Sequence, residues 1–408
     1  MAIIRPFTAL RPMPGNVDRV SAVPYDVVNT EEARALAAGN PLSFLHVSRA
    51  EIGLPPSTDP YSDAVYDRAL ENFNRLRASA PLVIEDTPSV YFYRLRMGNH
   101  NHMGLAACYS LDEYDRDLIK KHERTRREKE DDRTRHISTL RAQTGPVFLT
   151  YRASRAIDAV ADRVTSTPPL FDFEAVDGVR HTVWRVTGAD LALLVKVFGD
   201  LPCLYIADGH HRAASAARTR KYLAETEPDA THEEADWVLA VAFPDNQTQI
   251  LPYNRIVKDL AAGHTPEAFL AALNARAPLS DGTASPARKG EISMYLGGRW
   301  HKFHLKGQAS DADVGSTLDV SLLQDQVLAP LLKIVDPRTD KRIDFVGGIR
   351  GTGELEKLVT MGKAAIAFSL FPVGVGDFMR IADAGEIMPP KSTWFEPKLR
   401  DGLLTHLI

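Results

Sequence analysis

The chain of 408 residues lacks most of the features that mark a specialised class of protein. It has only two cysteines, Cys108 and Cys203, which are too few for a disulfide framework and indicate a reducing compartment. No apolar run approaches the roughly 18 residues of a membrane span, and the N-terminus has no signal-peptide pattern. We therefore expect a cytoplasmic protein without a membrane partner.

An excess of charge of one sign is also lacking. The 49 basic and 53 acidic residues give a net charge of −4, whereas nucleic-acid-binding domains carry a marked basic excess. We therefore expect no nucleic-acid partner. The sequence contains neither a Walker loop nor a Gly-x-Gly-x-x-Gly fingerprint, so a nucleotide site would need another kind of phosphate-binding turn.

The composition is that of an ordinary globular protein, with 44% hydrophobic and 25% charged residues. Alternating strand-like and helix-like segments predict an α/β protein with mixed sheets, not a doubly wound nucleotide fold. The length exceeds that of a usual single domain. We expect an α/β region at 1–112, a core at 113–260, and a C-terminal α/β region at 261–408 whose proline-rich tail packs back on the core.

The most informative stretch lies in the expected core, from Cys203 to Tyr222. Its apolar residues 204–207 predict a buried strand, Asp208-Gly209 predicts a turn, and the alanine-rich residues that follow predict a helix. A helix start binds anions through its free N–H groups and its positive dipole end. Histidine and arginine side chains in the first turn are unfavourable unless an anion is present. The stretch therefore predicts a phosphate site.

Each residue of this turn has a candidate role. Asp208 would position a phosphate or a substrate hydroxyl and is the candidate ligand for Mg²⁺, and His210 would take part in catalysis. We expect Asp208 to lie within reach of His210 or His211 in a pocket; the alternative is a solvated turn in which Asp208 only caps the helix. The candidate phosphate-binding residues are Gly209, His211, Arg212 and Ser215.

The five residues from Asp208 to Arg212 resemble the Asp-Gly-His-His-Arg motif of the ParB/sulfiredoxin-like superfamily, which includes free serine kinases. Members of that superfamily place this strand, turn and helix against nucleotide phosphates. Over its whole length the chain resembles the bacterial domain-of-unknown-function family numbered 1015. The segments that carry this second resemblance are Arg5-Pro6-Phe7, 24–28, 40–44, Lys121-His122-Glu123, 207–212 and 388–395.

The superfamily resemblance implies a phosphotransferase that acts on a small hydroxyl compound. Free L-serine is the best guess for the acceptor, with ATP, ADP or pyrophosphate as donor. The resemblance also implies a catalytic glutamate upstream of the turn, and Glu123 matches it by order and context. The alternative is a ParB-like regulatory protein that binds or hydrolyses a nucleotide without kinase activity. A homo-oligomer is compatible with either function.

Further candidates line the expected pocket. Lys121 and His122 follow an apolar pair and precede a charged helix, which favours a place in a cleft. The proline-rich tail offers a second wall of the substrate pocket, and a strap over the core is the alternative for it. Arg255 is a candidate phosphate contact, or else caps a strand end. The tail candidates are Lys391, Thr393 and Trp394.

Three further local patterns predict secondary structure or a turn. Residues 41–47 predict a buried strand. The loop with His100 and His102 predicts an exposed turn between two strands, with no third ligand close by for a metal. Thr125 and Glu128 have the spacing of a capping box at the start of the charged helix.

Overall fold

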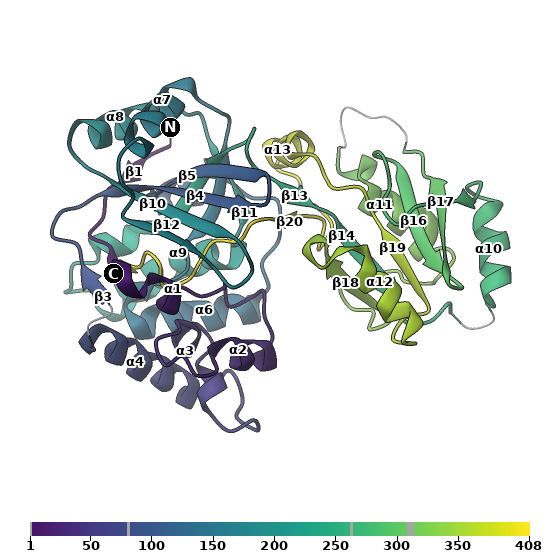
Figure 1. Ribbon diagram of the computed structural model, residues 1–408, viewed down its shortest axis with the longest axis horizontal. Helices are drawn as coiled ribbons and strands as arrows, with labels where there is room; N and C mark the ends of the chain where they lie inside the picture. Colours follow the sequence, from purple (N-terminus) through teal and green to yellow (C-terminus); the bar gives the residue numbers. More distant parts are fainter. Residues whose placement is uncertain (1, 80–81, 262–263, 308–313) are drawn as a thin grey trace. The chain divides into compact units, whose positions relative to one another are not determined.

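The computed structural model describes residues 2–79, 82–261, 264–307 and 314–408 (Figure 1). Its contacts divide the chain into two compact units: Met1–Thr248 with Pro397–Ile408, and Gln249–Glu396. Both units combine helices with sheets, so the chain is an α/β protein, and the large sheet of the first unit is mixed. The division differs from the expected boundaries at 112 and 260, because strands on either side of residue 112 pair within one sheet. Among the described residues, no helix is long and apolar enough to span a membrane.

The first unit is built on a mixed sheet of nine strands. The strands are β1 (Ile4–Arg5), β4 (Val90–Met97), β5 (His100–Ser110), β6 (Ile119–Lys120), β8 (Val147–Tyr151), β9 (Phe171–Glu174), β10 (Arg180–Val186), β11 (Leu204–Asp208) and β12 (Trp237–Pro244). Their order is β6-β11-β8-β12-β5-β4-β10-β9, with β1 paired to β5. β11 runs parallel to β6 and β12 parallel to β8, whereas β8 and β11 are antiparallel. A separate pair joins β2 (Leu10–Pro12) to β3 (Leu82–Ile84).

Helices flank this sheet. They are α1 (Val17–Val20), α2 (Thr30–Ala37), α3 (Leu45–Ser48), α4 (Asp63–Ala78), α5 (Leu111–Asp115), α6 (Arg127–Leu140), α7 (Arg155–Thr165), α8 (Gly188–Gly199) and α9 (His210–Thr226). In Figure 1, α7 and α8 lie above the sheet, and α2, α3, α4 and α6 lie below it. The helices below the sheet bury a second apolar core around Phe44 and Phe73.

Helix α9 packs closely on the sheet because its contact face is made of small residues. Ala213, Ala216 and Ala217 are buried in the same core as Leu204 and Ile206 of β11. Alanine also has the highest intrinsic helix propensity. The close packing fixes the first turn of α9 at the carboxyl end of β11, where the predicted phosphate site lies.

The last twelve residues, 397–408, belong to the first unit although the chain leaves that unit at residue 248. Asp401 forms an isolated β-bridge with Ala22. Near the end, β21 (His406–Leu407) pairs with β7 (Ala142–Gln143). This segment brings Lys398 and Asp401 to the site region.

The second unit contains a six-stranded antiparallel sheet with the order β15-β17-β16-β19-β14-β18. Its strands are β14 (Tyr253–Val257), β15 (Ser280–Asp281), β16 (Glu291–Leu296), β17 (Arg299–His304), β18 (Ile343–Gly347) and β19 (Ile366–Ser369). A separate pair joins β13 (Ile250–Leu251) to β20 (Trp394–Phe395). The helices are α10 (Pro266–Asn274), α11 (Asp319–Leu323), α12 (Gly351–Thr360) and α13 (Val375–Asp383).

All three local predictions fail, and the first two fail because burial outweighs local sequence. Residues 41–47 are not a strand; they form a turn that leads into α3, with Phe44, Leu45 and Val47 buried at helical spacing. His102 is not in an exposed turn. It lies within β5, fully buried, with its ring stacked on Phe243 at 4.3 Å between centroids.

The predicted capping box is also wrong. Helix α6 begins at Arg127, so Thr125 precedes the N-cap position, and the side chain of the N-cap residue makes no capping hydrogen bond. The Thr125 hydroxyl instead donates to the carboxylate of Glu130.

Candidate active site

The turn between β11 and α9 requires glycine. Gly209 has φ +94°, a left-handed conformation that favours glycine over all other residues. A Cβ atom there would lie 3.1 Å from Arg212 Nε and 3.4 Å from the Val147 backbone. Because Gly209 is the N-cap residue and has no side chain, the first N–H groups of α9 have no N-cap side chain as an acceptor. The start of α9 therefore lacks a side-chain cap, as an anion site needs; anion binding there stays a prediction.

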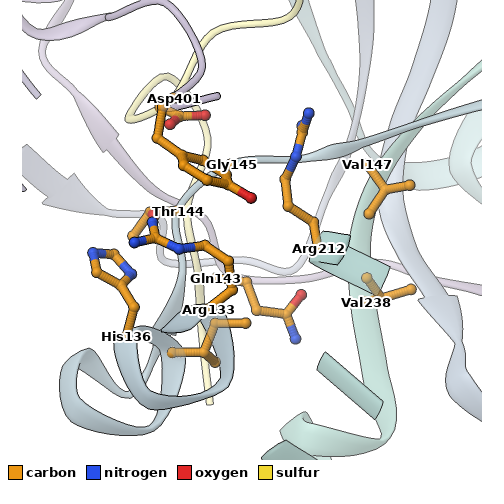
Figure 2. Close-up of a pocket in the computed structure, with 11 residues that line it drawn as sticks. Arg133, His136, Gln143, Thr144, Gly145, Val147, Arg212, Val238 and Asp401 are labelled. Carbon is orange, nitrogen blue, oxygen red and sulfur yellow. The ribbon is translucent and has the colours of Figure 1, made fainter. Parts of the chain in front are cut away.

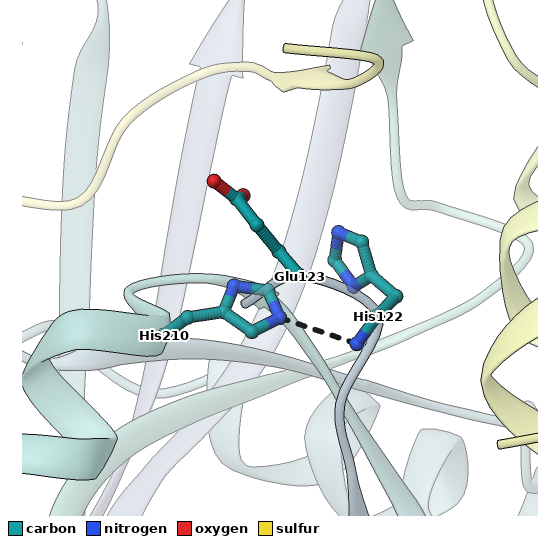
Figure 3. Close-up of side chains that lie close together, drawn as sticks. All are labelled: His122, Glu123 and His210. Carbon is teal, nitrogen blue, oxygen red and sulfur yellow. Dashed lines mark hydrogen bonds between the residues drawn. The ribbon is translucent and has the colours of Figure 1, made fainter. Parts of the chain in front are cut away.

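A loop from the expected upstream position lies at this helix start. His122, Glu123 and His210 each offer one ligand atom, and these atoms lie within 4.8 Å of one another (Figure 3). The rings of His122 and His210 meet edge to face at 4.4 Å between centroids. The His122 backbone N–H donates to His210 Nε2 at 3.5 Å. Glu123 thus lies beside the turn, where we expected it; its chemical role stays a prediction.

Both histidines of this cluster are neutral at pH 7. Burial lowers the pKa of His122 to about 4. Burial, and then the neighbouring His122, lowers the pKa of His210 well below its ordinary value. Only 2% of His122 and 5% of His210 is exposed. Glu123 is partly exposed, so the cluster combines two buried imidazoles with a carboxylate that solvent can reach.

Asp208 lies between two cations. Its Oδ2 accepts a hydrogen bond from Arg212 Nη2 at 3.0 Å and lies 3.5 Å from Lys398 Nζ. Burial favours the neutral acid, but Lys398 and then Arg212 outweigh it and hold the pKa of Asp208 well below its usual range. The carboxylate is therefore ionised at all pH values near neutrality.

This arrangement does not fit the expectation that Asp208 holds Mg²⁺. The ion would have to compete with Lys398 and Arg212 for the same carboxylate, and like charges repel. Mg²⁺ also usually binds through one or two carboxylates together with substrate phosphates. We derive no step through a metal at Asp208.

Sequence reasoning missed Lys398. It expected the tail to contribute Lys391, seven positions earlier, because the prolines around that residue suggested a rigid wall. Which lysine reaches Asp208 depends on the path of residues 397–408 through the first unit, and no local pattern distinguishes the two.

Arg212 is a structural cation more than an exposed phosphate contact. It is 7% exposed, and its guanidinium donates to the Pro146 carbonyl and to Asp208. Asp26 Oδ2 lies 3.8 Å from it. Burial opposes its charge, but Asp26 and Asp208 raise the pKa of Arg212 further. Its first effect is to hold the Asp208 carboxylate in place.

A small cavity lies beside Arg212 (Figure 2). Its volume is about 30 Å³, which suits about one water molecule, not a nucleotide. Asp401 lines it, and burial raises the pKa of that carboxyl to about 7 although Arg212 opposes the shift. The other lining residues are Tyr25, Arg133, His136, Ile137, Gln143, Thr144, Gly145, Val147 and Val238.

Three other predicted residues have structural partners. His211 Nε2 accepts the Arg126 backbone N–H at 3.0 Å and so ties the loop to α9. Ser215 is fully buried, and its hydroxyl donates to the Glu130 carbonyl of α6 at 3.2 Å. Lys121 donates to the Tyr114 carbonyl at 2.6 Å. Ser215 and Lys121 thus make packing and loop contacts within the first unit.

The remaining candidates belong to the second unit and are described there by themselves. Arg255 is 4% exposed, donates to the Tyr253 carbonyl and lies over the Phe345 ring at 5.3 Å. Burial lowers its pKa to about 9. The Lys391 ammonium lies 5.5 Å from the centre of the Tyr253 ring. Trp394 Nε1 donates to Glu396 at 2.8 Å, and Thr393 is half-buried.

Residues 4–321 match the model of a family described as "Protein of unknown function (DUF1015)". The chain belongs to this family. This is the family that the sequence resembles over its whole length. No curated protein matches the sequence of this DUF1015 member.

Solved structures give distant likenesses. A conserved hypothetical protein from Pyrococcus furiosus is 15% identical, with 72% of this chain and 93% of that chain covered and a TM-score of 0.35. A free serine kinase in complex with AMP is 13% identical, with coverage of 71% and 87% and a TM-score of 0.36. SbnI from Staphylococcus aureus, truncated at its C-terminus, is 13% identical, with coverage of 73% and 85% and a TM-score of 0.39. At these TM-scores the likenesses support no conclusion about the site.

Proposed function

We propose that this DUF1015 protein is a phosphotransferase that phosphorylates a small hydroxyl compound, with free L-serine as the best candidate acceptor. The phosphoryl donor is ATP, ADP or pyrophosphate. The observation that carries the proposal is that Glu123 lies beside the uncapped start of α9, next to an ionised Asp208 that two cations hold. The resemblance of residues 208–212 to the superfamily motif supports the same function.

The donor phosphates would bind at the start of α9. Free N–H groups and the helix dipole stabilise negative charge there. Lys398 supplies a flexible ammonium that can move from Asp208 to a phosphate oxygen when the donor binds. Arg212 stays buried and keeps Asp208 oriented. Phosphoryl transfer depends mainly on this kind of positioning and charge neutralisation.

Glu123 would act as the general base. Its carboxylate accepts the proton of the acceptor hydroxyl, the hydroxyl oxygen forms the new bond to phosphorus, and the bond between phosphorus and the donor's leaving oxygen breaks. A positioned base of this kind contributes about 10²–10⁴-fold to a rate. His122 and His210 are neutral and buried, so they shape the wall beside Glu123 and do not compete for its negative charge.

The test is a screen of donors against acceptors by phosphorus NMR. ATP, ADP and pyrophosphate are each incubated with L-serine, L-threonine, L-homoserine or glycerate. We expect a new phosphomonoester resonance with one donor, and with L-serine as acceptor. Donor binding without any phosphorylated product would favour the ParB-like alternative, and an absence of both binding and product would overturn the proposal.

A further inference from the structure

Three side chains that proteins use as metal ligands converge at the start of α9. One ligand atom each from His122, Glu123 and His210 lies within 4.8 Å of the other two (Figure 3). Within the described ranges of the chain, no other group of three or more histidine, cysteine, aspartate or glutamate side chains converges in this way. Two of the ligands come from one loop, and the third comes from the first residue of a helix far along the chain.

The donor set selects a class of ion. Two imidazole nitrogens and one carboxylate oxygen suit zinc and its neighbours in the first transition row, whereas Mg²⁺ and Ca²⁺ prefer oxygen ligands throughout. Two histidines and one glutamate also form the protein ligands of several zinc enzymes, in which another position stays open.

The geometry is close to that of a metal site. Ligand atoms in a tetrahedral zinc site are about 3.4 Å apart, given bonds of about 2.1 Å, so the separations must shorten by at most about 1.4 Å. The two histidines are buried, whereas Glu123 lies in the loop before α6 and is partly exposed. The contact between the His122 N–H and His210 Nε2, at 3.5 Å, is a long hydrogen bond that holds the ring weakly.

We propose that His122, Glu123 and His210 bind a divalent transition-metal ion of the zinc class, with at least one coordination position open to water or a ligand oxygen. This site goes beyond the proposed phosphotransfer, in which Glu123 acts as a general base without a metal ion. The ion and the acceptor hydroxyl would use the same carboxylate, so metal binding and base catalysis exclude each other.

The experiment titrates Zn²⁺ into the full-length, nucleotide-free protein by calorimetry after treatment with a chelator. We expect one ion per chain. Glu123→Gln should weaken Zn²⁺ binding at least about tenfold. Even the loss of a residue that only hydrogen-bonds to a metal ligand lowers metal affinity by about that factor. The matched control is His304→Ala, which removes an exposed histidine 3.6 Å from Glu291 in the second unit and should leave Zn²⁺ affinity unchanged.

Co²⁺ provides a second readout because its visible absorption reports coordination by nitrogen and oxygen ligands. The bands should appear in the wild type and weaken in both Glu123→Gln and His210→Gln. If the buried His210 variant fails to fold, Glu123→Gln, whose side chain is partly exposed, decides alone. Absence of Zn²⁺ binding in the wild type, or equal Zn²⁺ affinity in Glu123→Gln, would overturn the proposed site. Neither result depends on any phosphotransferase activity.

Discussion

At the scale of single residues, the site is organised by a buried charge network. Asp208, which carries a full negative charge, is held by Arg212 and Lys398, and Arg212 is itself shared with Asp26. Removing one partner from such a network leaves an uncompensated charge in a region of low dielectric, which costs more than the pair itself contributes.

Arg212→Ala should therefore destabilise the protein by about 3–5 kcal/mol, the range for breaking a buried ion pair, and not only weaken ligand binding. Urea unfolding would measure this change in the free energy of unfolding. Arg218→Ala is the matched control on the same helix. Its partners Glu130 and Asp131 lie nearer the surface, and its loss should cost about 1 kcal/mol or less. Equal costs for the two variants would contradict the account of Arg212.

Asp319 predicts a pH dependence in the second unit. Burial raises the pKa of its carboxyl to about 6, and Oδ1 accepts the Gly290 N–H at 2.8 Å. The folded state thus keeps a proton that the unfolded chain releases near pH 4. Stability should fall as the pH rises from about 4 to 6, and the loss persists above that range.

Asp319→Asn keeps the acceptor and removes the charge, so it should stabilise the protein by about 2–3 kcal/mol at pH 7.5 and by much less at pH 4.5. Urea unfolding at the two pH values, with the exposed Asp325→Asn as control, would check this. A stabilisation that is the same at both pH values would refute the explanation.

Sequence reasoning found part of the site at this scale. The resemblance to the superfamily motif placed Glu123 beside the 208–212 turn, and the structure brings Glu123 and His210 together; their catalytic roles stay predictions. Sequence reasoning did not find Lys398, and it gave Arg212 and Ser215 ligand roles although both have buried protein partners. Such partners come from elements distant in sequence, so no local pattern reveals them.

At the scale of elements, the candidate site depends on α9 and on the turn that precedes it. Local rules predicted this strand, turn and helix because its signals agree: an apolar run, then Asp-Gly, then alanines. The prediction for residues 41–47 failed because a short apolar segment fits a strand and a buried helical turn equally well.

Gly209→Ala should destabilise the turn more than an ordinary glycine substitution does. Alanine at φ +94° has a backbone cost of about 1–2 kcal/mol, and its Cβ would also crowd the Arg212 guanidinium. Gly178→Ala isolates the backbone cost, since φ there is +76° with nothing within 4 Å of the added Cβ. Thermal or urea unfolding should show the larger loss for Gly209→Ala. A larger loss for Gly178→Ala would contradict the close packing of the turn.

At the scale of the whole molecule, the chain forms two compact units, and the first is completed by the last twelve residues. Composition and periodicity predicted the α/β class. They predicted that the proline-rich tail packs back on the core, but not that residues 397–408 are the segment that rejoins the first unit. The pairing of β21 with β7 joins segments more than 260 positions apart, which no local pattern indicates. The candidate residues Arg255, Lys391, Thr393 and Trp394 belong to the other unit, and their roles in substrate binding stay predictions.

The central claim is that the first unit holds a phosphotransferase site in which Glu123 is the base. The most direct measurement compares turnover and donor affinity in wild type, Glu123→Gln and the exposed control Glu128→Gln, with the donor and acceptor that the phosphorus NMR screen identifies. The account predicts that Glu123→Gln loses about 10²–10⁴-fold in turnover while donor affinity, measured by calorimetry, stays nearly unchanged, and that Glu128→Gln resembles the wild type. Full turnover in Glu123→Gln would contradict it.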